Sequence, residues 1–297
     1  MSTEDNREQR NAIFGPGQGQ QSLPVGVDPR MPMQSAADKV KAEFGLDIPL
    51  ETVPLPSSGK VYSQESTLYG VETVEIRPMT AREEDILTSR ALIKRGTIIT
   101  ELIKSCLVDR SINPADLLGG DRNSLMVAIR ITGYGPEYPA EIECRECGTK
   151  AKHDFDLAQL PIRRLAIDPV TPGSNLFEFT LPRSKKLVRF RFLTGRDEED
   201  IMTTAEKQKK LGISTESNVT TNLMHAIVSI SGIEDRSKIA SFIKMMPAMD
   251  SLTLRNYIKD NEPGIIMKQE TSCPSCGHSE EVVMPLGMNF LWPQAGR

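Results

Sequence analysis

The sequence predicts an α+β protein built from two similar lobes, and three observations support this fold class. The two halves repeat a set of residues in the same order, each half changes between strand-like and helix-like spacing of apolar residues, and each half ends in a Cys-x-x-Cys-Gly motif. The repeat is clearest in pairs of residues separated by 129 positions: Asp121 and Asp250, Leu125 and Leu254, Ile129 and Ile258. Self-similarity at a fixed offset indicates an internal duplication.

The duplication extends upstream of these pairs. Residues 80–88 read Thr-Ala-Arg-Glu-Glu-Asp-Ile-Leu-Thr, and residues 194–203 read Thr-Gly-Arg-Asp-Glu-Glu-Asp-Ile-Met-Thr, at an offset of 114 to 115. The second copy is therefore about 14 residues longer between the two blocks. We expect the chain to divide into an arm over 1–44, a first lobe over 45–160, a linker over 161–175 and a second lobe over 176–297.

The N-terminal arm contains a Gly- and Gln-rich run from Gly15, followed by several prolines, with scarcely any apolar periodicity. Such a segment cannot bury enough apolar surface to offset the entropy of ordering it. We expect a flexible, extended arm or a strap.

Each lobe is expected to begin with a β-hairpin. Residues 45–79 contain short extended pieces broken by prolines, and residues 176–181 and 187–193 alternate between apolar and polar side chains around a turn at Pro182. Alternation at period two is typical of a strand with one buried face.

A helix is expected to follow each hairpin. Thr80 with Glu83 three residues later predicts a capping box, and Thr194 is followed by Asp197 and Glu198 in the first turn. Acidic side chains in the first turn also favour the helix dipole. The carboxylates of both helix starts are therefore predicted to cap helices and to contact solvent, and neither group is predicted to be catalytic.

Further amphipathic segments complete a helical bundle in each lobe. They lie at 98–108, 114–118 and 122–131 in the first half and at 222–230, 239–246 and 252–258 in the second. Asp121 and Asp250 are expected to cap the last helix of each half. Cys106 lies on an apolar helical face and is predicted to be a small core residue.

The remaining four cysteines form the two knuckles: Cys144, Cys147, Cys273 and Cys276. A structural zinc needs four ligands, and one knuckle supplies only two. We therefore predict that the four thiolates bind one structural Zn²⁺ per chain, in a shared zinc-ribbon-like site that clasps the halves together. The glycine after each knuckle suits a turn that needs positive φ. Whether the metal is zinc or iron stays open.

Other interpretations of the knuckles are less favoured. The chain has five cysteines, no signal peptide and no hydrophobic run near 18 residues, which argues against disulfides and against a membrane. A thioredoxin-like motif would open a helix, whereas these flanks alternate like hairpins. Two separate sites completed by His153 or His278 would each lack one ligand. Because catalytic zinc keeps an open position, four thiolates favour a structural role.

The composition limits the function classes. The net charge is −4, with 36 basic and 40 acidic residues, so the chain has no overall attraction for nucleic acid. Local basic clusters at 183–191 and 207–210 are expected to contact solvent. No phosphate-binding loop, nucleophile elbow or metalloprotease histidine pair is present, and the chain holds only three histidines. We therefore expect that the protein is not an enzyme and that it has no small-molecule substrate.

Three longer blocks, residues 48–62, 74–89 and 119–135, carry a resemblance to a known family. With the segments between them, they resemble the T-even-type baseplate protein family of contractile-tailed bacteriophages, over most of residues 45–290. The resemblance implies a non-enzymatic structural component of the virion tail baseplate or its hub, assembled in the host bacterial cytoplasm. Its implied partners are other baseplate and tail hub proteins.

Two alternatives remain beside that structural role. The same resemblance also implies a baseplate hub assembly factor that is absent from the mature virion. A zinc-ribbon module that binds nucleic acid is the third hypothesis. The predicted zinc rests on the cysteines of this chain and not on the family.

Overall fold

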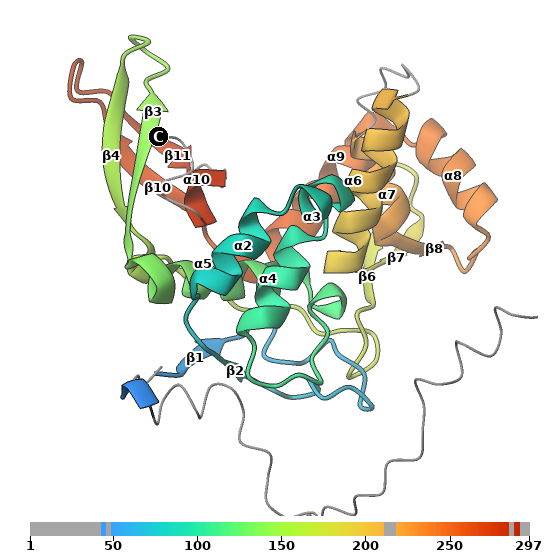
Figure 1. The fold of residues 1–297 in the computed structure, drawn as a ribbon. Helices are drawn as coiled ribbons and strands as arrows, with labels where there is room; N and C mark the ends of the chain where they lie inside the picture. The colour runs from blue at the N-terminus through green and yellow to red at the C-terminus, as the bar shows by residue number, and fades with distance from the viewer. Residues whose placement is uncertain (1–42, 46–48, 211–217, 285–287, 292–297) are drawn as a thin grey trace, which may run out of the picture. The chain divides into compact units, whose positions relative to one another are not determined.

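The computed structural model describes residues 43–45, 49–210, 218–284 and 288–291. The chain divides into two compact units, Met1–Asp47 and Ile48–Arg297, and everything below concerns the second unit. Almost all of the predicted arm over 1–44 lies outside the described residues. The second unit mixes helices with small β-sheets, as the α+β prediction requires (Figure 1).

The first half contains short strands and helices in the predicted order. In chain order they are β1 (Glu51–Pro54), β2 (Thr73–Ile76), α2 (Ala81–Thr88), α3 (Arg90–Arg95), α4 (Ile98–Cys106), the 3₁₀ turn η2 (Pro114–Asp116), α5 (Gly119–Tyr134), β3 (Glu137–Glu143), β4 (Lys150–Asp156) and the 3₁₀ turn η3 (Leu157–Gln159).

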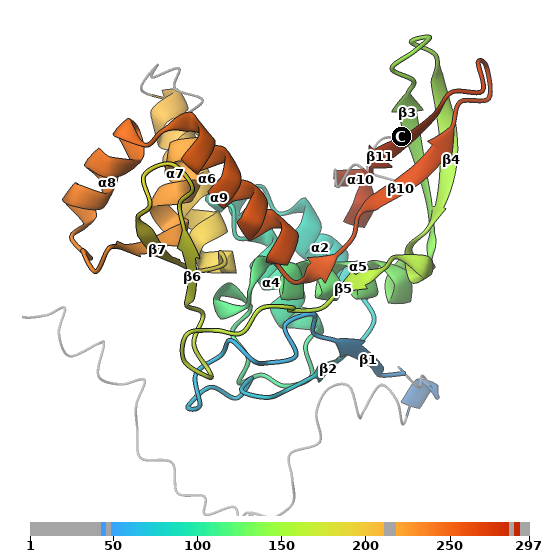
Figure 2. The ribbon, with the colours of Figure 1, turned by 180° about the vertical axis from the view of Figure 1, so that it is seen from behind.

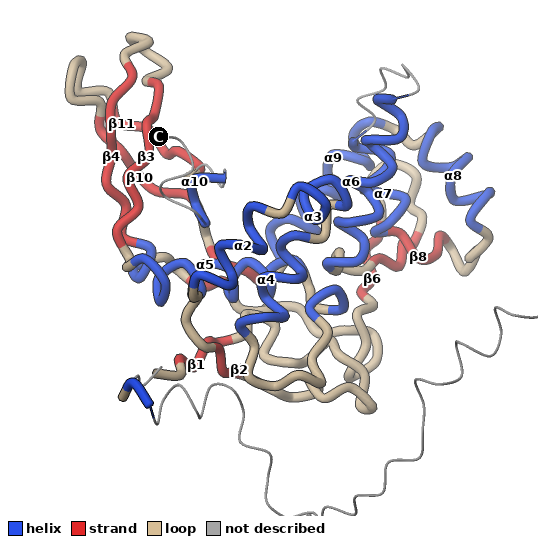
Figure 3. The backbone as a smooth tube through the Cα atoms, in the orientation of Figure 1, coloured by secondary structure: helices blue, strands red, loops and turns tan. Residues whose placement is uncertain are grey.

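The second half follows a similar order. Its elements are β5 (Ile162–Arg163), β6 (Phe177–Thr180), β7 (Leu187–Phe190), α6 (Gly195–Lys210), α7 (Asn218–Ala226), β8 (Ile227–Ile230), α8 (Arg236–Met245), α9 (Ala248–Asn261), β9 (Gly264–Ile265), β10 (Lys268–Ser272), β11 (Ser279–Val283) and α10 (Met288–Leu291). Figure 3 shows α10 beside the hairpins β3–β4 and β10–β11, whereas α6, α7, α8 and α9 lie near the sheet that contains β6 and β8.

The described strands pair only in small antiparallel sheets. β1 pairs with β2, β3 with β4, β5 with β9 and β10 with β11, while β6, β7 and β8 form a sheet of three strands. The hairpins β3–β4 and β10–β11 lie side by side although more than a hundred residues separate them (Figure 2). The short pair β5–β9 joins the predicted linker to the end of the second half.

Two segments that were expected to be helical differ in the structure. Residues 114–118 form only the 3₁₀ turn η2, Pro114–Asp116. The amphipathic segment 222–230 was expected to be helical throughout, but α7 ends at Ala226 and Ile227–Ile230 form strand β8. The β-branched residues in this stretch favour the strand, in which Ile227 and Ile230 are buried against β7. Tertiary pairing with β7 therefore outweighs the helical spacing of the apolar residues.

A single hydrophobic core extends across both halves. Leu125 and Ile129 on α5 and Leu254 on α9 are all fully buried and belong to the same cluster. Phe177, Phe190 and Phe192 stack together in the second half, with ring centroids 4.8 to 5.9 Å apart. Apolar burial of this kind is the main favourable term in folding.

Main-chain contacts join the start of α5 to the start of α6. The Gly119 amide donates to the Leu193 carbonyl at 3.0 Å, and the Gly195 amide donates to the Leu117 carbonyl at 2.9 Å. At Gly120, a Cβ atom would lie 1.7 Å from the Pro263 carbonyl oxygen. The absence of a side chain at Gly120 therefore permits α5 to approach the chain just before β9.

The capping contact at α2 recurs at α6. The amide and hydroxyl of Thr80 donate to Glu83, and Arg77 pairs with the same carboxylate at 2.6 Å. In the second half, the amide and hydroxyl of Thr194 donate to Asp197, with which Arg191 pairs at 2.5 Å. All three pairs of equivalent residues are offset by 114 positions.

A second contact also recurs. The carboxylate of Asp121, in the first turn of α5, accepts hydrogen bonds from the amide and hydroxyl of Ser57. The carboxylate of Asp250, in the first turn of α9, accepts from the amides of Arg183 and Ser184. In each half the aspartate thus fixes the turn that follows a Leu-Pro pair. The expectation that Asp121 and Asp250 cap their own helices is wrong, because the N-caps are Leu118 and Pro247, without side-chain cap hydrogen bonds, and both carboxylates bind the distant turn instead.

Candidate metal centre

The two knuckles form the tips of two β-hairpins. Glu143 pairs with Lys150 at the last register position of β3–β4, and Ser272 pairs with Ser279 at that of β10–β11. Each hairpin therefore brings its Cys-x-x-Cys segment into a tight turn immediately beyond the paired strands.

Both knuckle turns are closed by the same hydrogen bonds. The Gly148 amide donates to the Cys144 carbonyl, and the Gly277 amide donates to the Cys273 carbonyl, each at 2.9 Å. Gly148 and Gly277 have φ values of 70° and 72°, in the left-handed region that a side chain would disfavour. The expectation that these glycines permit positive φ is confirmed.

The two knuckles bring the four thiols together. The sulfurs of Cys144 and Cys276 lie 3.7 Å apart, as do those of Cys147 and Cys273, and all four lie within 4.8 Å of one another. Within the described part of the chain, this is the group of metal-ligating side chains that could hold an ion. All four cysteines are free thiols in the structure.

The geometry fits a tetrahedral thiolate site. Zinc–sulfur bonds are about 2.3 Å long, so the sulfurs of a regular tetrahedron lie about 3.8 Å apart. Both 3.7 Å sulfur separations, each between different hairpins, are close to this value. The residues present could therefore hold zinc with small changes in side-chain position, and a four-thiolate set is also compatible with iron.

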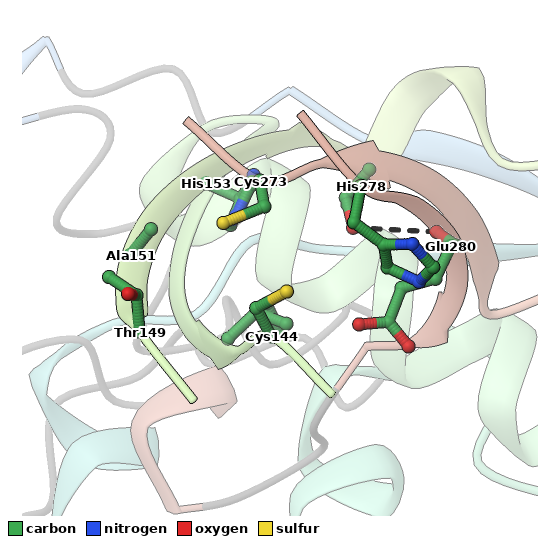
Figure 4. A pocket seen from close by; sticks show the side chains of 9 residues that line it. Cys144, Thr149, Ala151, His153, Cys273, His278 and Glu280 are labelled. Atoms are coloured by element: carbon green, nitrogen blue, oxygen red, sulfur yellow. Dashed lines mark hydrogen bonds between the residues drawn. The ribbon is translucent and has the colours of Figure 1, made fainter. Parts of the chain in front are cut away.

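A small cavity of about 10 Å³ lies between the hairpins, next to the thiols. In Figure 4 the Cys144 and Cys273 side chains extend from the two hairpins into the space between them, and His153 and His278 also line the cavity. Neither histidine belongs to the cluster of four ligands that the described residues form. The structure thus groups the four cysteines with one another and not into two sites that each include a histidine.

The exposed and buried thiols alternate. Cys144 and Cys273 are buried, whereas Cys147 and Cys276 are exposed. Hydrogen bonds from the Thr149 hydroxyl and amide lower the pKa of the Cys147 thiol to about 6, while, despite an opposing main-chain hydrogen bond, burial and the neighbouring thiols raise the pKa of Cys276 to about 12. The coupled thiols therefore favour a single thiolate, on Cys147; the thiolate is the form of cysteine that binds a metal.

A salt bridge also links the two hairpins. Arg145, between the cysteines of the first knuckle, lies 3.3 Å from the Glu280 carboxylate on β11, and the Arg145 amide donates to the same group. The second knuckle has Pro274 at the corresponding position, so the contact has no counterpart there. Sequence analysis did not identify this pair, because no local pattern marks a contact between hairpins so distant in sequence.

The other residues singled out from the sequence lie elsewhere. Glu83 and Asp197 cap helices as described above, but the expectation that they contact solvent is wrong, because both are buried and each pairs with an arginine. Glu84 accepts a hydrogen bond from the Tyr134 hydroxyl. Cys106 is fully buried in the core, where burial raises the pKa of its thiol to about 12. The prediction that Cys106 is a core residue is confirmed.

Residues 49–172 match the model of the family described as T4 bacteriophage base plate protein. This segment is therefore similar to bacteriophage baseplate proteins, and the resemblance seen in the sequence to the T4-type family is confirmed over these residues. The match covers less than half of the 297 residues and includes Cys144 and Cys147 but not the second knuckle. A baseplate family implies a component of the virion tail that interacts with other baseplate proteins.

No curated protein and no solved structure matches the chain. Within the described ranges, no helix combines the length and the apolar character that crossing a membrane requires.

Proposed function

We propose that this protein is a structural, non-enzymatic subunit of the baseplate of a contractile-tailed bacteriophage and docks neighbouring baseplate and hub subunits. The observation that carries the proposal is the family match over residues 49–172. The position of the matched segment supports a structural role, because it contains α5, the helix at the centre of the contacts between the halves.

We further propose that the two halves are copies of one ancestral unit. Three features support this: the Arg-Thr-acid contact at α2 and α6, the aspartate contact at α5 and α9, and the knuckle hydrogen bonds. The first recurs at an offset of 114 residues and the other two at 129, in the same order along both halves. Three contacts of different kinds that recur in the same order favour a duplication over chance.

In this proposal one zinc ion, held by the four cysteines, has a structural role. Bound zinc would supply four strong bonds that fix hairpin β3–β4 to hairpin β10–β11. The salt bridge from Arg145 to Glu280 supports the same arrangement. Structural zinc contributes on the order of 10 kcal/mol to the folding of small domains.

The location is tested by quantitative mass spectrometry of highly purified phage particles. We expect this protein at a fixed ratio to the tail tube protein that corresponds to three or six copies, or a multiple of these. Presence in assembly intermediates of infected cells but absence from complete particles would instead identify an assembly factor.

The metal is tested by elemental analysis of the purified chain. We expect about one zinc per chain, loss of the metal in Cys144→Ser, and retention in the control Cys106→Ala, whose thiol is outside the cluster. Two tightly bound zinc ions, iron, or no metal would contradict the shared zinc site. Absence of DNA or RNA binding at low salt would remove the nucleic-acid hypothesis.

A further inference from the structure

The starts of α5 and α9 are equivalent positions if the halves are copies, as proposed above. The offset of 129 relates Gly120 to Met249, Asp121 to Asp250 and Leu125 to Leu254. Both aspartates are fully buried in contact with a turn of their own half, and both leucines are fully buried in the core. The surroundings of the two helix starts can therefore be compared residue by residue.

The start of α5 is covered by the second half. Gly119, Gly120 and Arg122 are buried. The guanidinium of Arg122 lies over Gly195 and near two glutamates of α6, Glu198 at 3.8 Å and Glu199 at 3.9 Å. Arg196 pairs with Asp116 at 2.5 Å beside them.

The start of α9 is open among the described residues. Met245 at the end of α8, Met249 in the first turn of α9 and Leu252 one turn later are 85%, 57% and 46% exposed. Pro247 and Ala248 between them are also exposed. We call Met245, Met249 and Leu252 the methionine corner; it lies where α8 is followed by α9, two helices that Figure 2 labels. Exposed apolar side chains grouped in this way are typical of interaction sites.

The methionine corner cannot accept a second copy of the element that covers α5. The glycine that permits main-chain approach is replaced by Met249, the arginine that binds the glutamates of α6 by Ser251, and the aspartate that pairs with Arg196 by Met245. A partner must therefore contact this face through apolar side chains and not through a close main-chain approach.

The charge beside the corner further defines the partner. The turn held by Asp250 carries three exposed basic residues, Arg183, Lys185 and Lys186. Arg183 interacts with the Asp250 carboxylate and contributes to lowering its pKa, whereas Lys185 and Lys186 form no salt bridge within the described ranges. Electrostatic complementarity favours carboxylates opposite such a turn and opposes a basic partner. Methionine side chains are flexible and polarisable, so they adapt to an apolar partner surface.

We propose that the methionine corner docks a segment of another baseplate protein that presents apolar side chains next to carboxylates. This inference rests on the proposed baseplate function. It commits to a different protein and not to a second copy of this chain, because the contacts that bind the second half to the first are missing from this face.

Oxidative footprinting tests the docking. The rates of methionine oxidation by hydrogen peroxide are compared between the purified chain and the largest phage complex that contains it. We expect Met245 and Met249 to be protected at least tenfold in the complex relative to Met202, which is 49% exposed on α6 and serves as the control. If the oxidation rates of Met245 and Met249 relative to Met202 are the same in the purified chain and in the complex, the proposal is overturned. Protection of these methionines in the concentrated isolated chain would also overturn it, because it would identify a second copy as the occupant.

Charge reversal tests the chemistry of the partner. The double variant Lys185→Glu with Lys186→Glu should reduce incorporation into phage complexes at least tenfold, whereas Lys94→Glu on α3 should not. If the double variant and the Lys94→Glu variant are incorporated equally, the proposal that the partner presents carboxylates is overturned. The two proposals fail separately, because a chain present in particles with freely oxidised methionines contradicts only the docking. A chain found only as a free monomer contradicts both.

Discussion

Single carboxylates determine where several elements of this protein begin. Burial of Glu83 acts to raise its pKa, but hydrogen bonds from Arg77, Ser105 and Thr80 outweigh this and lower the pKa to about 2. The side chain of Glu83 is fully buried, so it exchanges hydration for these three partners. Its negative charge therefore stabilises the folded state wherever the carboxylate would also be ionised in the unfolded chain.

We predict that Glu83→Gln lowers the free energy of unfolding by about 2 kcal/mol at pH 7, since it removes a cap and the charge opposite Arg77. Because the folded pKa lies below the unfolded one, the contribution is complete above about pH 4.5 and is lost as the pH falls toward 2. Urea unfolding at pH 7 and pH 3 measures both effects. Asp85→Asn, an exposed change on the same helix, is the control, and an equal loss at both pH values would contradict the prediction.

The capping residues show what sequence could and could not predict at this scale. Thr80 and Glu83 were predictable because a capping box has a fixed local spacing. The roles of Arg77 and Arg191 were not predicted, although both arginines occur three residues before the threonine. The repeated arginine was the available signal, and only the structure shows that it pairs with the third residue of the helix.

Close packing between elements depends on α5. This helix contacts β1, β9, α4 and α6, and Gly120 is its point of closest approach to the chain before β9. A methyl group there would meet a main-chain carbonyl oxygen, which cannot move without displacing the strand.

We predict that Gly120→Ala destabilises the protein by about 2 kcal/mol or more, as overpacking does in a rigid site. Gly133→Ala in the same helix is the matched control. Its Cβ would meet the terminal methyl of Met79, a flexible side chain that can turn away, while alanine favours the helix. Thermal unfolding of both variants tests the prediction. Equal losses of stability in Gly120→Ala and Gly133→Ala would show that the close main-chain approach at Gly120 does not cause the destabilisation.

The two knuckle hairpins provide a second prediction at the scale of elements. With zinc bound, Cys144→Ser should increase amide hydrogen exchange in β10–β11 as well as in β3–β4, because each hairpin supplies half of the ligands. A chelator applied to the unaltered chain should reproduce the effect. Faster exchange confined to β3–β4 would contradict a shared site.

Elements with strong local patterns were predicted, and those that depend on distant pairing were not. The segments that became α4, α5 and α8 had helical spacing of apolar residues, and the knuckle flanks alternated as strands do. β5 and β9 are two residues each, and each is a strand only because it pairs with the other. The segment that became β8 had ambiguous spacing, and its partner β7 decided the outcome.

For the whole molecule, the convergence of the four cysteines was predictable because four ligands had to come from two knuckles. The covering of α5 by the second half and the exposure of the methionine corner were not predictable. Both depend on how the halves pack, which the repeated sequence does not encode in local spacing. The domain limits at 45–160 and 176–297 stay predictions.

The arm over residues 1–44 leads to a prediction about assembly. Deletion of residues 1–40 should change the melting temperature of the isolated chain by less than about 2 °C, since a segment of this composition adds little burial. The same deletion should impair incorporation into particles, measured by mass spectrometry of purified phage. A large loss of thermal stability in the isolated chain would show that the arm belongs to the fold.

The position of the thiol cluster also determines how a pulling force would pass through the chain. Four metal–sulfur bonds between residues 144–147 and 273–276 would close everything between them into a loop. Tension applied between β1 and the end of β11 would then pass through the metal site and bypass α6 to α9. The methionine corner lies inside this loop and would keep its shape while the segments outside the loop carried the load.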